Sequence, residues 1–130
     1  MGSLNRSQES PEERARTALG LVIADLERSG HAVRPHGVVV LTTTVPDGDR
    51  RGMEVQYGGH AFPLPPEATL AEMTADIAFR LQDDVVDDAS AGWPMSSDGR
   101  RLLLPGIGED GRAHWFDERS EVAPVGSLPV

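Results

Sequence analysis

The 130-residue chain contains no cysteine and no lysine, and only 5% of its residues are aromatic. Without cysteine it cannot form a disulfide scaffold, a zinc–thiolate site or a cysteine nucleophile. No apolar run approaches the roughly 18 residues that a membrane-spanning helix requires. The 21 acidic residues outnumber the 12 basic ones, all of which are arginine, and the net charge of −9 argues against binding to nucleic acid.

The first half of the chain predicts one helix followed by a hairpin. Ser10 and Pro11 form a typical helix start, and apolar residues recur at helical spacing as far as Gly30, so we expect a helix over residues 10–29. Beyond it, β-branched and alternating segments flank the turn dipeptide Asp47-Gly48. The polar face of the helix is expected to carry Arg14, Asp25 and Arg28, and the expected strands are residues 38–45, 53–57 and 60–62.

The second half repeats this plan. Thr69 and Glu72 have the spacing of a capping box, which predicts a helix over residues 70–90 that ends at Gly92. Two further Asp-Gly turns indicate an antiparallel meander. The expected strands are residues 100–104, 112–116 and 121–123.

The order α-β-β-(β)-α-β-β-(β) predicts an α+β fold. Strands joined by tight turns pair antiparallel, so we expect a two-layer sandwich with one antiparallel sheet and two helices on one face. A single domain over residues 10–123 is expected between a disordered N-terminus, residues 1–9, and a flexible tail, residues 124–130. The N-terminus shows no signal-peptide pattern, and with no cysteine we expect a cytoplasmic location.

Negative charge gathers around the second expected helix. Residues 66–130 carry 13 acidic side chains and 5 arginines, whereas residues 1–65 carry 8 and 7. Four of the acids, Asp83, Asp84, Asp87 and Asp88, lie near the helix C-terminus, where the helix dipole and like-charge neighbours oppose them. Three interpretations stay open: a solvated face, an acidic docking surface and a divalent-cation site. Without EF-hand spacing we expect no metal and no cofactor.

Aromatic residues extend this candidate surface. The second helix is apolar over a wider arc than one sheet covers, and we expect Phe79 to pack on the first helix or on a second copy of the chain. Trp93 follows the helix end, either as a plug between helix and sheet or as an interface anchor. The candidate partner-binding residues are Phe79, Asp83, Asp84, Asp87, Asp88 and Trp93.

Catalytic motifs are missing from the sequence. The glycine-rich run 106–111 is followed by an expected strand instead of a helix, and no G-x-S-x-G motif occurs. Four histidines lie outside any metal-ligand spacing. His60 and His114 are the pair that the expected sheet could bring close together. With a nearby carboxylate, such a pair would suit a ligand site or an enzyme. We therefore predict no catalytic residue from motifs alone.

Four short motifs mark the C-terminal half: the run 81–88, Gly92-Trp93-Pro94, His114-Trp115 and Gly126-Ser127-Leu128. With them the chain resembles the C-terminal part of small uncharacterised proteins from high-GC actinobacteria. Those proteins often carry cysteine and histidine after the Trp-Pro pair and after the second tryptophan. Here these places hold Met95-Ser96-Ser97 and Phe116-Asp117-Glu118, so the resemblance implies no metal knuckle, and it brings no known activity.

The sequence favours a non-enzymatic protein-interaction domain, such as an adaptor, an immunity or antitoxin-like protein, or a small acidic chaperone. The alternative is a small-ligand-binding domain or an enzyme that uses His60 and His114 with a nearby carboxylate. We expect another protein as partner, with a basic surface to match the acids, and a homodimer as a second arrangement. Neither nucleic acid nor membrane is expected as a partner.

Overall fold

The elements follow the expected order, which confirms the α+β fold class. The computed structural model describes residues 9–89 and 92–128, with the side chains of residues 85–89 left aside. The helices are α2 (Pro11–Arg28) and α3 (Leu70–Ala89), and the strands are β1 (His36–Val45), β2 (Gly48–Tyr57), β3 (His60–Leu64), β4 (Leu104–Ile107), β5 (Ala113–Asp117) and β6 (Ser120–Pro124).

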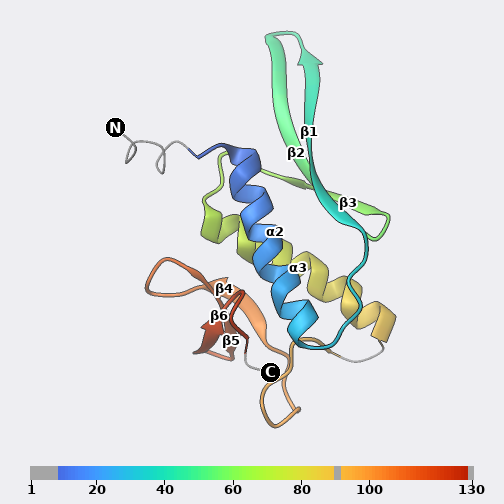
Figure 1. The fold of residues 1–130 in the computed structure, drawn as a ribbon. Coiled ribbons are helices and arrows are strands. Elements are labelled where there is room, and N and C mark those ends of the chain that lie inside the picture. Colours follow the sequence, from blue (N-terminus) through green and yellow to red (C-terminus); the bar gives the residue numbers. More distant parts are fainter. Residues whose placement is uncertain (1–8, 90–91, 129–130) are drawn as a thin grey trace.

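The strands form two separate antiparallel sheets where one was expected. One has the order β1-β2-β3 and the other β4-β5-β6. In Figure 1 the helix pair lies between them, with α2 against α3. The division follows from α3, whose 20 residues extend about 30 Å at 1.5 Å per residue and carry the chain away from the first sheet before β4 begins.

Local capping chemistry sets both helix starts, as predicted. The Ser10 side chain accepts a hydrogen bond from the Glu13 backbone N–H at 3.1 Å. At α3, the Thr69 N–H donates to Glu72 Oε1 at 2.9 Å, and the Glu72 N–H donates to Thr69 Oγ1 at 3.1 Å. This reciprocal pair is the expected capping box. Hydrogen bonding of the Glu72 carboxylate to the Thr69 backbone, and less strongly to the Thr69 side chain, lowers the pKa of Glu72.

One continuous core joins the helices to both sheets. Val55 and Leu64 reach it from the first sheet, and Leu103 and Trp115 reach it from the second sheet and the segment before it. Burying an aliphatic side chain of this size contributes about 1.5–3 kcal/mol, so the helix pair is stabilised from two sides. No helix in the described ranges is both long and apolar enough to cross a bilayer.

The region before β4 differs from the sequence prediction of a strand over residues 100–104. Met95 and Leu102 form an isolated antiparallel bridge, and Gly99 adopts a φ of +72° in the turn between them. The Asp-Gly turn therefore closes a small loop, and β4 starts only at Leu104. The strand prediction was placed too early because the turn serves this loop and not a hairpin of the main sheet.

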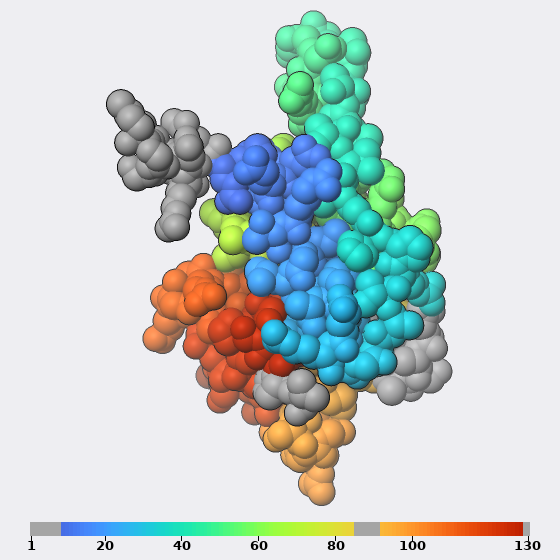
Figure 2. Space-filling model, viewed as in Figure 1, coloured from blue at the N-terminus to red at the C-terminus, as the bar shows by residue number. Residues whose placement is uncertain are grey.

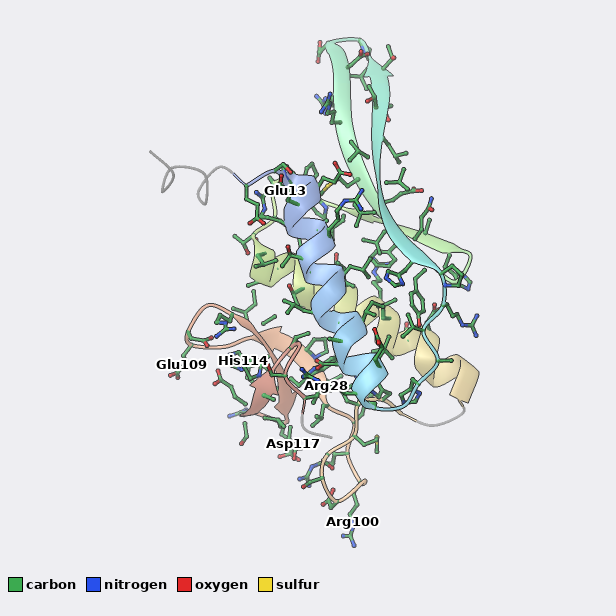
Figure 3. The ribbon with its side chains drawn as sticks, in the orientation of Figure 1. Glu13, Arg28, Arg100, Glu109, His114 and Asp117 are labelled. Atoms are coloured by element: carbon green, nitrogen blue, oxygen red, sulfur yellow. The ribbon has the colours of Figure 1, made fainter. Side chains whose placement is uncertain are left out.

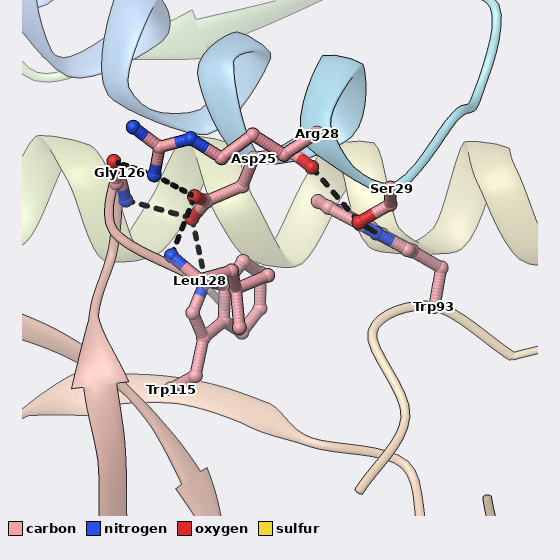
Figure 4. A network of polar contacts seen from close by, with 7 residues as sticks. All are labelled: Asp25, Arg28, Ser29, Trp93, Trp115, Gly126 and Leu128. Carbon is pink, nitrogen blue, oxygen red and sulfur yellow. Dashed lines mark hydrogen bonds and ion pairs between the residues drawn. The ribbon is translucent and has the colours of Figure 1, made fainter. Parts of the chain in front are cut away.

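Two further expectations are corrected at Asp25 (Figure 4). Its carboxylate is fully buried instead of lying on a solvent-exposed polar face, and it accepts hydrogen bonds from Trp115 Nε1 at 2.8 Å, Gly126 N at 2.7 Å and Leu128 N at 3.0 Å. Val125 is also buried. The backbone N–H groups of Gly126 and Leu128 thus tie to α2 a segment that was expected to be a flexible tail.

The β1–β2 hairpin extends beyond the core. Its strands pair over their full ten residues, from His36 opposite Tyr57 to Val45 opposite Gly48, whereas β3 covers β2 only over residues 53–57. We call residues 41–52 the arm; its side chains are exposed or half-buried. Figure 2 shows its outer part standing clear of the rest of the molecule.

Candidate functional site

Phe79 is exposed on the outer side of α3. The residue is 54% accessible, so the expected packing of its side chain on the first helix does not occur within the chain. Asp76 and Asp83 lie three and four residues away, on the same side of the helix. We call Glu72, Asp76, Phe79 and Asp83 the Phe79 face. It combines an exposed aromatic ring with three carboxylates.

The remaining candidate residues fall elsewhere. Asp84 lies beside the Phe79 face and is half-buried. Trp93 is buried, in edge contact with Trp115 at 5.3 Å between ring centroids, and its Nε1 donates to Ser29 Oγ at 2.9 Å. It therefore plugs the junction between α2 and the second sheet and offers no surface to a partner. The side chains of Asp87 and Asp88 lie outside the described residues.

Arginine neutralises only part of this acidic surface. Arg80 lies with its guanidinium 5.4 Å from the centre of the Phe62 ring, and its Nε is 3.7 Å from Asp76 Oδ1. Both groups of that ion pair are partly solvated, so the pair contributes about 0.3–0.5 kcal/mol, the value for such helix pairs. Arg80 is thus held toward the first sheet, at the edge of the Phe79 face.

His114 and Asp110 form the arrangement closest to a catalytic pair. His114 Nε2 lies 3.0 Å from both oxygens of Asp110. Hydrogen bonds from the Arg112 backbone and from His114 lower the pKa of Asp110. The other ring nitrogen, Nδ1, is buried and has no hydrogen-bond partner in the part of the chain that the structure describes. A general base needs its free nitrogen within reach of a substrate proton, and this nitrogen is enclosed.

The two histidines of the alternative hypothesis lie apart. His60 begins β3 in the first sheet, and His114 lies in β5 of the second. Figure 3 shows His114 beside Glu109 on the far side of the helix pair from the arm. His60 instead lines a shallow surface hollow with His36. No group of three metal-ligating side chains occurs within the described residues.

An ion pair joins Arg101, in the segment before β4, to Asp117 at the end of β5. Arg101 donates from Nε to Asp117 Oδ1 at 2.7 Å and from Nη2 to Asp117 Oδ2 at 2.9 Å. The Ser96 backbone N–H donates to the Arg101 carbonyl at 2.8 Å. Arg101 thereby lowers the pKa of Asp117, mainly through these side-chain hydrogen bonds. The loop after Trp93-Pro94 is therefore linked to the end of β5.

Comparisons of the chain with models of protein families, with curated proteins and with solved structures gave no match. The candidate site therefore rests on its own geometry. Sequence reasoning missed the arm, because Arg50-Arg51-Gly52 reads as part of a polar turn and not as a strand. The length of the run of strong β-formers over residues 38–45 could have revealed the arm, because this run is longer than a hairpin needs to reach the core.

Proposed function

We propose that this chain is a non-catalytic protein-interaction domain that binds a basic surface of another protein through the Phe79 face. The observation that carries the proposal is the exposure of Phe79 among carboxylates, on a helix whose opposite side is buried in the core. Exposed aromatic residues are typical anchors of interfaces, and a charged rim adds selectivity and a faster encounter. A cytoplasmic location remains part of this proposal.

The buried side of α3 supports a rigid interface. Met73, Ile77 and Leu81 are fully buried, so the backbone that carries Phe79 is held in place before a partner arrives. Glu72 is held by the capping box. Pre-ordered side chains reduce the entropy that binding costs, which favours binding to this face over binding to a loose acidic segment.

The enzyme alternative has weaker support. The free nitrogen of His114 is enclosed, and His60 lies in the other sheet. Four hollows of the described surface are lined by other residues, and neither His114 nor Asp110 is among them. Asp110 is partly exposed, but a substrate could reach Nδ1 of His114 only if the second sheet opened.

The test uses two variants of the Phe79 face and one matched control. The immobilised protein is used to capture partners from cells of its natural source, and the affinity of the captured basic protein is then measured. Phe79→Ala should weaken binding by about 2 kcal/mol, which is roughly 30-fold in Kd. Asp83→Asn should weaken it less and reduce its salt dependence. Ile107→Ala removes an equally exposed apolar side chain from β4 and should leave binding unchanged.

Hydrogen exchange then locates the contact. A partner bound as proposed protects the amides of residues 72–84, and this protection disappears in Phe79→Ala. Binding that both Phe79→Ala and Asp83→Asn leave intact would show that the partner uses another surface.

A further inference from the structure

The outer edge of β1 has no strand beside it in the part of the chain that the structure describes. The sheet order β1-β2-β3 leaves β1 with a single neighbour, so every second residue directs its N–H and C=O groups away from β2, and residues 40–44 are exposed. Natural edge strands are protected from pairing by charged residues, proline or bulges. The strand from His36 to Val45 contains no aspartate, glutamate, lysine, arginine or proline, and its pairing with β2 runs without a register shift.

The middle of β1 also exposes apolar side chains that the core does not use. Val40 is 38% accessible and Leu41 is 41% accessible. Both belong to a run of β-branched and apolar residues with high strand propensity. An unprotected edge with exposed apolar residues is a template for a further strand.

The charge distribution favours a β1 edge contact in which a second copy of this chain supplies the added strand. Two copies with a net charge of −9 each repel one another over most of their surfaces. The stretch from His36 to Pro46 carries no formal charge, so it is where two copies approach at the lowest electrostatic cost. Its midpoint is Leu41.

Antiparallel pairing about this midpoint is self-complementary. Residue 36 of one copy lies opposite residue 46 of the other, and uncharged residues face each other throughout. Just beyond the paired stretch, Asp47 at the tip of one arm lies opposite Pro35 of the second copy, next to Arg34. The same pairings occur at both ends of the contact, because a two-fold axis repeats each of them.

We propose that β1 pairs with β1 of a second copy, antiparallel about a two-fold axis at Leu41, and joins two three-stranded sheets into one of six strands. The arrangement closes at the dimer, because each copy uses its open β1 edge once. It is independent of the proposed function, since it leaves the Phe79 face free. It also accounts for an arm that extends beyond the core.

The test is the mass of the full chain in solution, measured by light scattering after gel filtration at micromolar concentrations. The expected mass is twice the monomer value of 14.0 kDa. Leu41→Lys and Leu41→Asp each place like charges opposite one another across the axis, and each variant should be monomeric. An equal mixture of the two should recover the dimer, because residue 41 of one copy faces residue 41 of the other. Ile107→Lys adds the same charge to the other sheet and should remain dimeric.

Three results would overturn the proposal. The first is a monomeric wild-type chain, which would leave the edge to a strand of a different protein or to none. The second is a dimer that both Leu41 variants preserve, which would place the interface elsewhere, for example at Phe79. The third is a mixture of the two variants that stays monomeric, which would exclude the two-fold register. Far-UV circular dichroism is the control for folding, and each variant should give the wild-type spectrum because residue 41 is exposed.

Discussion

The two sheets are stabilised by different kinds of contact. The first sheet has two strands of ten residues, and its outer half relies on its own hydrogen-bond ladder. The second sheet has strands of four or five residues and is attached to α2 by the buried carboxylate of Asp25. The second sheet thus combines the burial of Trp115 with hydrogen bonds to Asp25, whereas the outer half of the first sheet has its ladder alone.

This difference predicts different costs of damage. Loss of the Asp25 anchor leaves buried donors on Trp115, Gly126 and Leu128 without their acceptor. Loss of the arm removes residues that bury little. We therefore expect the second sheet to be sensitive to the loss of one carboxylate and the first to tolerate the removal of a whole segment.

The largest effect is expected for Asp25→Asn. The amide keeps one acceptor oxygen and turns an NH₂ group toward a backbone donor, so at least one buried N–H loses its partner, and the others lose a charged one. Hydrogen bonds to charged groups contribute about 1.5–3 kcal/mol each, and we expect the free energy of unfolding to fall by about 2–4 kcal/mol. Urea denaturation measures this decrease in the free energy of unfolding.

Glu27→Gln is the matched control, because Glu27 is an exposed acid on the same helix. It should change the free energy of unfolding by no more than about 0.5 kcal/mol. An Asp25→Asn variant as stable as this control would mean that the anchor contributes nothing, and the contrast between the sheets would be lost.

Excision of the arm is expected to have a smaller effect. Leu41 and Gly52 are register partners, so residues 42–51 can be replaced by Asn-Gly, which favours a tight hairpin turn. In the monomeric Leu41→Lys background, where no second copy covers the arm, the deleted side chains are exposed or half-buried, so the free energy of unfolding should change by about 1 kcal/mol or less. Thermal and urea unfolding of the shortened chain measure this change. A failure to fold would show that the arm is part of the core structure.

Local chemistry explains how much of the fold could be predicted. The starts of both helices follow from caps within four residues, at Ser10 and at Thr69, and such signals are visible in a sequence. The division into two sheets is not visible there. It depends on where the chain lies when it leaves α3, and that position is set by packing between segments far apart in sequence.

The candidate site was predictable only in part, for the same reason. The acidic residues around Phe79 follow from helical spacing, but the exposure of its ring does not, because periodicity alone places Phe79 within the apolar arc. Asp25 has the spacing of a solvent-facing residue, and it is buried because β5 and the C-terminal segment cover that side of α2. Contacts across about 100 residues leave no local signal.

The smallest effect that we predict is a loss of stability of the second sheet at acidic pH. Arg101 lowers the pKa of Asp117 below its ordinary value of 3.8, so the carboxylate stabilises the fold above that pH. The contribution is lost as the pH falls below 3.8 and through the lowered folded-state pKa. Asp110 and Asp98 have lowered pKa values as well, so they act in the same direction. Amide exchange of β5 should therefore speed up between pH 5 and pH 3, relative to the intrinsic rate, more than that of β2.

Asp117→Asn separates this ion pair from the other acids. The variant should exchange faster than the wild type in β5 at pH 5, where the carboxylate is charged. The difference between the two proteins should shrink toward pH 3, because the wild-type carboxylate is then increasingly protonated and resembles the amide. Since both partners are partly solvated, added salt should reduce the same difference at pH 5. If the difference in β5 exchange between the two proteins stays constant with pH, Asp117 acts through the geometry of its hydrogen bonds and not through its charge.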